Sequence, residues 1–299
     1  MSTSARTRAP PRSAAVRGFG LLLITTVSWG LNWPVIKFLL GVLPPFSVRV
    51  LAAVLGVGLG FLVAAVRHER LVPPRHQWAR LVISALLNFS SFMISATVSM
   101  LWLRASEAVI IAYTLPIWAA LLAWPVLGER PTRLRLVALV LGLLGVIVMM
   151  SGQPVDASWQ KLPGVLCALT GSVMFAFGAV TSKRWPLAMP PVAGVAWQVG
   201  IGSAPALVPA VFEHPNWGAA PASAWICLFY LGTVPVIIAY LAWFRALKLL
   251  PASTAAIGTL LVPVIGVVSS VLLLGDAFGP RQIAGLVLTL TGVALAARR

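Results

Sequence analysis

The stretch ASEAVIIAYTLPIWAALLAWPVLGE at residues 105–129 has a counterpart in ASTAAIGTLLVPVIGVVSSVLLLGD at residues 252–276. Both copies begin with Ala-Ser, carry a proline at the aligned position (Pro116 and Pro263), and end in Leu-Gly followed by an acidic residue. The prolines and the Gly-acid steps make this match informative, because leucine and valine coincide often in any apolar sequence. The chain therefore repeats itself at an offset of 147 residues, and its fold consists of two related halves.

The composition excludes a water-soluble domain. Of the 299 residues, 60% are hydrophobic and only 9% are charged, whereas a soluble domain carries roughly 25% charged residues. Apolar runs of about 20 residues recur along the chain, and each is long enough to cross a ~30 Å hydrocarbon core as a helix. We predict an all-α membrane protein with ten transmembrane helices, at residues 18–38, 45–66, 79–101, 105–127, 133–151, 162–182, 191–212, 222–244, 252–274 and 281–297.

The basic residues predict the orientation of these helices. Lys and Arg accumulate in short loops on the cytoplasmic side of a membrane. With the N-terminus inside, most of the 22 Lys and Arg residues fall in cytoplasmic segments, and the outward segments hold only Lys37, Arg49, Arg104, Lys161 and Arg281. One missed helix would scramble this alternation, so both termini are predicted to be cytoplasmic. Residues 1–17 are expected to form a disordered basic tail.

The duplication predicts an inverted repeat. The first half is expected over residues 18–151 and the second over residues 162–297, with five helices in each. Because five is an odd number of crossings, the second half enters the membrane from the opposite side. Inverted repeats are common in secondary transporters, whose binding site lies near the midplane between the halves. Duplication also builds channels, so a membrane channel stays open as an alternative.

Several of these segments resemble the drug/metabolite transporter superfamily, EamA type. The similar residues are Trp29-Gly30-Leu31-Asn32-Trp33 with Lys37, the start of the second helix from Arg49 to Ala53, and both copies of the repeated stretch with Leu127-Gly128-Glu129-Arg130 and Leu274-Gly275-Asp276. The resemblance covers nearly the whole chain after the basic tail, and it implies a ten-helix exporter in the bacterial inner membrane. In its abundance of tryptophan, the chain most resembles members of the aromatic amino-acid exporter branch.

The titratable residues argue against an enzyme. All acidic residues and histidines fall in loops or at predicted helix ends: Glu69, Glu107, Glu129, Asp156, Glu213, Asp276, His68, His76 and His214. A catalytic site needs converging titratable groups, so we expect no catalytic residue, metal ion or cofactor. The basic residues form short clusters between apolar runs rather than one continuous face, which argues against a nucleic-acid partner.

Uncharged polar and aromatic residues inside the spans are the candidates for binding a solute. Aromatic faces suit an apolar side chain, while amide groups can bind amino and carboxyl groups. Small polar residues on one helix stripe also join helices in membranes, and this alternative is open for Asn88. The predicted substrate-binding set, expected to face one central cavity, is Trp29, Asn32, Trp33, Asn88, Ser91, Tyr113, Gln198, Tyr240 and Trp243.

Prolines inside the spans are the candidates for helix breaks and gating. Proline lacks a backbone N–H, so Pro34, Pro116 and Pro263 each free a carbonyl that can face a cavity. Breaks at corresponding positions of two repeats are a sequence sign of a transport site. Near the first outward loop, Lys37 is interpreted as an interfacial side chain that snorkels. Arg49 either does the same or attracts a solute carboxylate.

These features together predict an exporter that works by alternating access. The expected partners are membrane lipid and a small solute, most simply an amino acid with an apolar or aromatic side chain, and the protein is expected to function as a monomer. Proton- and cation-coupled carriers commonly place Asp, Glu or His along the pathway, and no such residue falls mid-span here. Uncoupled, facilitated transport is therefore predicted, with a proton-coupled drug/metabolite exporter as the alternative.

Overall fold

The computed structural model describes residues 12–99, 101–103, 108, 111–150, 159–274 and 279–298, and every regular element in these ranges is helical. The first half contains α1 (Arg12–Leu40), α2 (Pro45–Val66), α3 (Trp78–Ala85), α4 (Ser91–Ser99), α6 (Leu115–Leu127) and α7 (Arg133–Met150). The second half contains α8 (Leu162–Arg184), α9 (Pro191–Ser203), α10 (Leu207–Val211), α11 (Ala222–Thr233), α12 (Ala239–Leu249), α13 (Ala252–Gly258), α14 (Leu261–Leu274) and α15 (Pro280–Ala297). Short 3₁₀ segments are η1 (Arg75–Gln77), η3 (Trp159–Lys161), η4 (Ala204–Ala206) and η5 (Trp217–Ala219), and two π-helical turns are η2 (Leu86–Ser90) and η6 (Val234–Ile238).

The helices follow the apolar runs of the sequence. Among the described residues, eight helical segments are long and apolar enough to cross a membrane, and α6 is a shorter apolar helix. Together with α7, which has 18 residues, α6 stands where the remaining two spans are predicted. An all-helical fold with many spanning helices is thus confirmed, while the count of ten and the sidedness stay predictions. The acids Glu107, Asp156 and Asp276 lie outside the described residues.

Prolines set several helix starts, and the first helix starts earlier than expected. Pro45, Pro191 and Pro280 each stand in the first turn of a helix, where the missing N–H costs nothing. Helix α1 begins at Arg12, so the helix includes the last residues of the segment 1–17 that the sequence predicts as a tail. The apolar and small residues that follow Arg12 extend the helix back to the last proline of the N-terminal segment.

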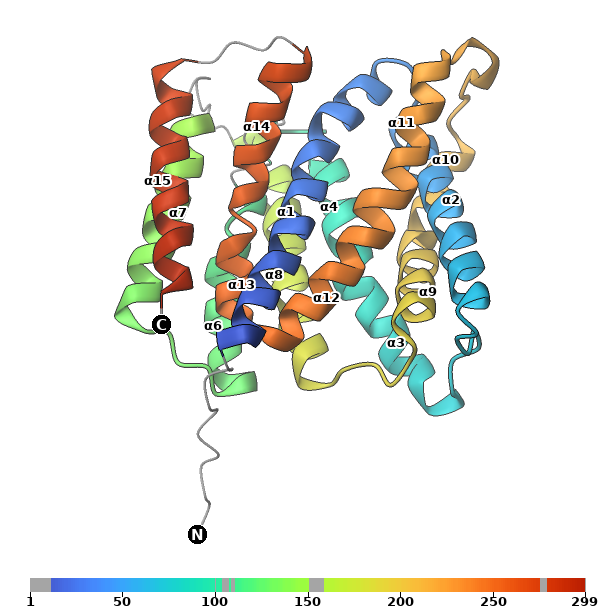
Figure 1. Cartoon of the computed structure of the whole chain (residues 1–299). Helices are drawn as coiled ribbons and strands as arrows, with labels where there is room; N and C mark the ends of the chain where they lie inside the picture. The colour runs from blue at the N-terminus through green and yellow to red at the C-terminus, as the bar shows by residue number, and fades with distance from the viewer. Residues whose placement is uncertain are drawn as a thin grey trace.

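The two halves pack in matched pairs of opposite direction. Helix α1 packs against α12 and α14, and its counterpart α8 packs against α4 and α6. Likewise α2 packs against α9, and α7 against α15. In Figure 1, α1 starts at the lower face of the bundle whereas α8 ends there, and α15 returns to that face. This arrangement is that of an inverted repeat in which each half contributes the same contacts.

Close helix contacts depend on glycine where α7 meets α15. A Cβ atom added to Gly145 would lie 2.6 Å from the carbonyl oxygen of Gly285, and one added to Gly285 would lie 2.6 Å from that of Gly145. Such contacts exclude any larger residue without a backbone shift. Small residues bring helices together in this way in membranes, where dispersion contacts rather than the hydrophobic effect hold helices together.

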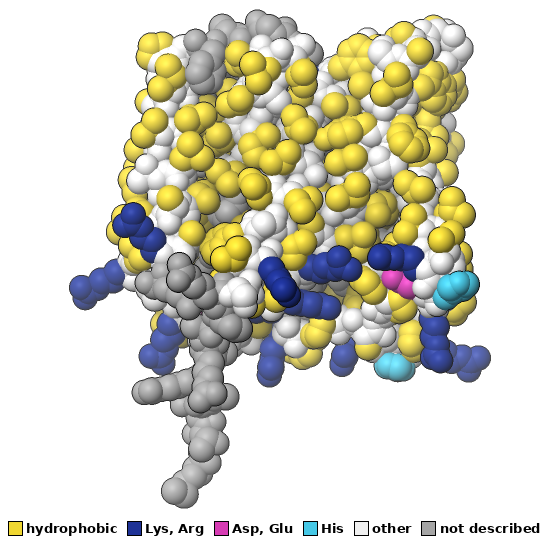
Figure 2. All heavy atoms as spheres, viewed as in Figure 1, with side chains coloured by type: hydrophobic (Ala, Val, Ile, Leu, Met, Phe, Trp, Pro, Cys, Tyr) yellow, Lys and Arg dark blue, Asp and Glu magenta, His cyan; other side chains and the backbone are white. Residues whose placement is uncertain are grey.

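Apolar and basic side chains occupy different zones of the surface. Figure 2 shows hydrophobic side chains over most of the viewed face, while Lys and Arg gather near its lower edge, where α1 starts. Exposed apolar residues include Leu62, Val66, Leu144, Ile226 and Phe229. A surface of this kind is stable only in contact with lipid, and the basic end is the one that the positive-inside rule assigns to the cytoplasm.

Two acids cap helices of the opposite half in a reciprocal way. Glu69 follows α2 and accepts hydrogen bonds from the backbone N–H groups of Val192 (3.1 Å) and Ala193 (3.0 Å) in the first turn of α9. Glu213 follows α9 and α10 and accepts a hydrogen bond from the N–H of Ser47 (2.6 Å) in the first turn of α2. A carboxylate satisfies free N–H groups there and favours the helix dipole. The acids therefore lock the α2–α9 pair at both ends.

Candidate functional site

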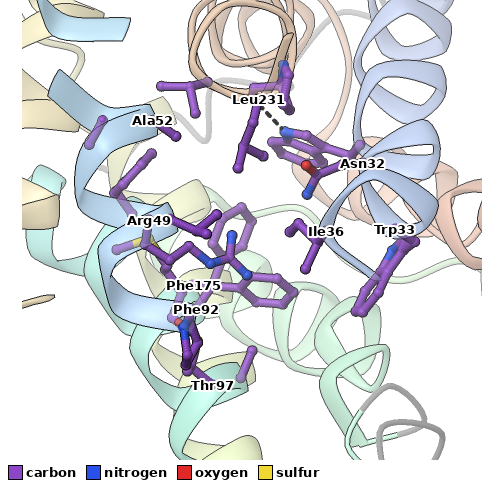
Figure 3. A pocket seen from close by; sticks show the side chains of 18 of the residues that line it. Asn32, Trp33, Ile36, Arg49, Ala52, Phe92, Thr97, Phe175 and Leu231 are labelled. Atoms are coloured by element: carbon purple, nitrogen blue, oxygen red, sulfur yellow. Dashed lines mark hydrogen bonds between the residues drawn. The ribbon is translucent and has the colours of Figure 1, made fainter. Parts of the chain in front are cut away.

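A cavity of about 410 Å³ lies between the two halves. First-half walls come from α1, α2 and α4, and second-half walls come from α8, η6 and α12. The lining residues that the sequence predicts as binding residues are Trp29, Asn32, Trp33, Tyr113 and Tyr240. Figure 3 shows Asn32 and Trp33 entering from α1 on one side and Arg49 from α2 on the other. The volume is that of a site for a small organic molecule.

Trp29 is at the centre of an aromatic wall. Its ring centroid lies 5.3 Å from that of Tyr240, 5.7 Å from that of Trp243 and 6.2 Å from that of Phe175. The indole Nε1 of Trp29 donates a hydrogen bond of 3.1 Å to the carbonyl oxygen of Pro235. This bond ties α1 to the π-helical turn η6 of the other half. The wall offers a fixed apolar surface to a solute side chain.

The third helical span of each half contains a π-helical turn next to the cavity. Turn η2 contributes Phe89 to the lining, and turn η6 contributes Pro235 and Val236. The Tyr240 hydroxyl donates a hydrogen bond of 3.0 Å to the backbone carbonyl of Asn88 in η2. A π turn departs from the regular α-helical hydrogen-bond ladder, and such turns occur frequently at functional sites. The π-helical turns of the two halves thus lie beside the same cavity.

The fourth helical span of each half is interrupted at the cavity. A turn at Tyr113–Thr114 precedes α6, which carries Pro116, and a turn at Thr259–Leu260 precedes α14, which carries Pro263. Tyr113 and Thr259 both line the cavity. Both interruptions therefore lie beside the space in which a solute would be held. Pro34, by contrast, stands inside α1, which continues as a helix to its end.

The cavity lining includes a few polar groups. Asn32 Oδ1 is buried and accepts no hydrogen bond. Arg49, which is partly buried, is the only charged side chain among the described lining residues. The hydroxyls of Thr97 and Thr259 already donate to backbone carbonyls of their own helical segments. The lining is thus mainly apolar, and its polar groups include the Asn32 amide, the Arg49 guanidinium and the Tyr113 hydroxyl.

We distinguish an open end and a closed end of the cavity by the burial of the residues that border each. At the open end its lining includes exposed residues, Leu40 (45% exposed) and Leu101 (74% exposed). Toward the start of α1, below Trp29, the cavity ends on side chains that are almost fully buried: Trp243, Leu247, Leu250 and Ala256. We call this the closed end.

An ion pair joins three helices at the closed end. Lys183 Nζ, in the last turn of α8, lies 2.9 Å from Glu129 Oε1, just after α6. The same oxygen accepts a hydrogen bond of 3.2 Å from the N–H of Ala252 at the start of α13. Lys183 also donates to the carbonyl oxygen of Leu250, which precedes α13. These contacts hold α6, α8 and α13 together beneath the buried side chains of Trp243, Leu247, Leu250 and Ala256, which we call the apolar plug.

Comparison with known proteins identifies the family. The sequence model of the EamA-like transporter family matches residues 16–151 and again residues 162–298. The chain belongs to the EamA-like transporter family. As in that family, two repeats make up the chain, and it is a multi-pass protein of the bacterial inner membrane.

Relatives of this EamA-type chain include proteins named as exporters. It is 26% identical to the aromatic amino acid exporter YddG of Ancylobacter novellus over 76% of this chain and 81% of that protein. It is 26% identical to a probable amino-acid metabolite efflux pump of Salmonella typhimurium, over 91% of this chain and 92% of that one. It is 27% identical to the uncharacterized transporter YvbV of Bacillus subtilis, over 92% and 90% of the two chains. A crystal structure with 22% identity superposes with a TM-score of 0.82 over 95% of this chain and 96% of the other, which shows a shared fold.

Four predicted binding residues of this EamA-type chain lie outside the cavity lining: Asn88, Ser91, Gln198 and Trp243. Asn88 Nδ2 donates to the hydroxyl of Ser182 (3.0 Å), and the hydroxyl of Ser84 donates to Gln198 Oε1 (2.7 Å). These bonds join helices, because a buried amide in a membrane protein is stable when neighbouring helices satisfy it. Ser91 donates to the carbonyl of Leu87 one turn earlier.

Trp243 lies behind the cavity wall rather than in it. Its side chain is fully buried at the closed end, next to Trp29. The lining residues that were not predicted from the sequence include four phenylalanines, Phe46, Phe89, Phe92 and Phe175. Their only signal in the sequence is their place on predicted helices, because phenylalanine is equally common on lipid-facing positions. Arg49, left open by the sequence, has its side chain in the cavity.

Proposed function

We propose that this EamA-type chain exports amino acids with apolar or aromatic side chains, and that it is a carrier rather than an enzyme or a channel. The observation that carries this proposal is the cavity between the halves, which combines an aromatic wall with an unpartnered amide and one guanidinium. Aromatic faces suit an apolar side chain, and the polar groups suit the charged ends of an amino acid. One relative is named as an aromatic amino acid exporter and another as a probable amino-acid metabolite efflux pump, which supports the direction and the solute class.

The architecture supports alternating access. Helix α1 contacts α12 and α14 as α8 contacts α4 and α6, so the two halves can exchange equivalent arrangements. The present arrangement leaves the cavity open at the face opposite the start of α1 and closed at the basic end. In the proposed orientation this is the outward-open state, and the opposite state loads solute from the cytoplasm. A cavity closed at one end favours a carrier over a channel.

We propose that transport is uncoupled from ion gradients and that one monomer surrounded by lipid suffices. None of the described lining residues is Asp, Glu or His, and these are the groups that exchange a proton or coordinate a cation in coupled carriers. The solute's own gradient would then drive export, which suits a cell that disposes of an excess metabolite. A proton-coupled exporter is the alternative that the coupling experiment addresses.

The function is tested by counterflow in proteoliposomes. Purified protein is reconstituted with a high internal concentration of one amino acid, and uptake of the labelled amino acid is measured against empty liposomes. A panel of phenylalanine, tryptophan, leucine, methionine, glutamate and lysine covers the solute classes. Saturable uptake of the apolar and aromatic members, with competition among them, is expected. Absence of uptake for every member, or uptake that does not saturate, would contradict the proposed carrier.

The coupling is tested in the same vesicles with equal solute on both sides. An imposed pH or sodium gradient is expected to leave the solute concentrations equal. Net uphill accumulation that collapses with an ionophore would contradict uncoupled transport and would favour the proton- or cation-coupled alternative.

A further inference from the structure

Arg49 occupies an unusual position for a cation in a membrane protein. It lies on α2, four residues after Pro45, roughly 6 Å along the helix from its open-end terminus. An arginine so close to a helix end usually extends toward the interface and keeps its charge in water. Here the side chain extends from α2 into the cavity instead (Figure 3). Its direction indicates a partner inside the cavity.

The carboxylates of the described residues are engaged elsewhere. Glu69 caps α9, and Glu129 pairs with Lys183 at the closed end. Glu213, the acid nearest to the start of α2, accepts from the N–H and the hydroxyl of Ser47 at 2.6 and 2.7 Å. Within the part of the chain that the structure describes, no acid therefore forms an ion pair with Arg49.

The Arg49 guanidinium in this cavity is a binding group for an anion. A charge within the membrane is costly unless it is paired or faces a water-filled cavity, and such residues mark substrate pathways. The guanidinium binds a carboxylate through two parallel hydrogen bonds, and this geometry adds specificity as well as affinity. On the opposite wall, Asn32 Oδ1 is a buried acceptor without a donor. Asn32 lines the cavity but this oxygen is not exposed to it, so a solute ammonium group reaches the oxygen only when the amide turns. Arg49 and Asn32 are then complementary to the two ends of a zwitterion.

We propose that Arg49 is the carboxylate anchor of the transport site and that Asn32 accepts from the solute's ammonium group, a reading that rests on the proposed carrier function. The solute's side chain then lies against Trp29 and Phe175, and its backbone bridges α1 and α2. The site selects a free carboxylate, and the guanidinium repels cationic amphiphiles. The substrate class is accordingly α-amino acids with apolar side chains, and cationic drugs are excluded.

The ligand itself provides the first test, because it leaves the protein unchanged. Wild-type counterflow is measured with phenylalanine and leucine and with their amides, phenylalaninamide and leucinamide, which keep the side chain and the ammonium group but lose the carboxylate. Each amide is expected to compete at least about tenfold more weakly than its parent, since hydrogen bonds to charged groups are the strong ones. If the amides compete within twofold as strongly as the amino acids, Arg49 is not a carboxylate anchor, while the proposed carrier function is unaffected.

Variants provide the second test. Arg49→Met is expected to lose the discrimination between phenylalanine and its amide, and Arg49→Lys, which keeps the charge but not the fork, is expected to recover part of it. Arg281→Met is the matched control, since it removes an exposed arginine of α15 near the same face. Folding of each variant is checked by size-exclusion profile and melting temperature. If the folded Arg49→Met variant keeps the tenfold discrimination between phenylalanine and its amide, the assignment of Arg49 as the carboxylate anchor is wrong. If the wild-type protein exchanges no amino acid at all, the proposed carrier function is wrong, independently of Arg49.

Discussion

The Lys183–Glu129 ion pair is expected to stabilise the closed end of the cavity. The pair joins the ends of α6 and α8 at 2.9 Å, and its side chains are 22% and 11% exposed. In the proposed alternating access, opening toward this end separates α6, α8 and α13, and it would break the pair and the bond from Lys183 to the Leu250 carbonyl. The substitution Lys183→Met removes these contacts and keeps the aliphatic stem.

The magnitude follows from the burial of the pair. An exposed ion pair contributes about 0–1 kcal/mol, and removal of one partner of a buried pair costs about 3–5 kcal/mol. The intermediate burial of Lys183 and Glu129 places the expected effect near 2 kcal/mol, between these two limits. Since 1.4 kcal/mol is a factor of ten, Lys183→Met is expected to shift the equilibrium toward opening of the closed end by about 30-fold.

Cysteine accessibility measures this shift. In a variant without Cys167 and Cys227, Ala256 is replaced by cysteine, because its side chain is 1% exposed within the apolar plug of the closed end. Labelling by a membrane-impermeant maleimide, added at the α1-start face, is expected to be about 30-fold faster with Lys183→Met. Lys248→Met, which removes an exposed charge from the last turn of α12, is the control and should leave the rate unchanged.

The double substitution Glu129→Gln/Lys183→Met separates the pair from general destabilisation. The double variant should label no faster than Lys183→Met alone, because each single change already removes the interaction. A labelling rate with Lys183→Met equal to that of wild type would refute the role of this ion pair in closing the cavity.

Two further predictions follow from the described contacts. Trp29→Phe keeps the aromatic wall but loses the hydrogen bond to the Pro235 carbonyl, so the apparent affinity for phenylalanine in counterflow should fall about three- to tenfold; an unchanged affinity would contradict the positioning of Trp29 by η6. Glu213→Gln weakens the cap of α2 at Ser47 and should reduce the melting temperature in detergent, by an effect of about 1 kcal/mol, whereas Asn216→Ala, in the same loop outside α2, should change it less.

The helices could be predicted well from the sequence because the length of each apolar run is enough to identify a spanning helix. The segment 45–66 is a helix with the predicted bounds, since a proline begins it and basic residues follow it. The predictions failed where charged residues were taken as loops. Helix α12 continues to Leu249 through Arg245 and Lys248, because long basic side chains at a helix C-terminus reach water without ending the helix. At the first helix, the same error placed the start at residue 18 instead of Arg12.

The site was harder to predict than the fold. A polar residue within a span needs an internal partner, but the sequence does not state whether the partner is a solute or another helix. Asn32 lines the cavity and its Oδ1 has no partner, whereas the amide nitrogen of Asn88 donates to Ser182 on α8, although Asn88 Oδ1 is unpartnered as well. The direction of the Arg49 side chain depends on the rotation of α2 against its neighbours. The positions of the π-helical turns could not be predicted from the sequence, because tertiary contacts decide where the extra residue is accommodated.

The central claim, that solute passes through the cavity between the halves, is tested most directly by filling it. Ala96 lines the cavity from α4, and Ala65 is exposed on α2 toward the lipid. Labelled phenylalanine counterflow is measured for Ala96→Trp and for Ala65→Trp, with both proteins purified and reconstituted to equal density. Ala96→Trp is expected to abolish exchange, while Ala65→Trp is expected to retain the wild-type rate. Equal exchange by the two variants would contradict transport through this cavity.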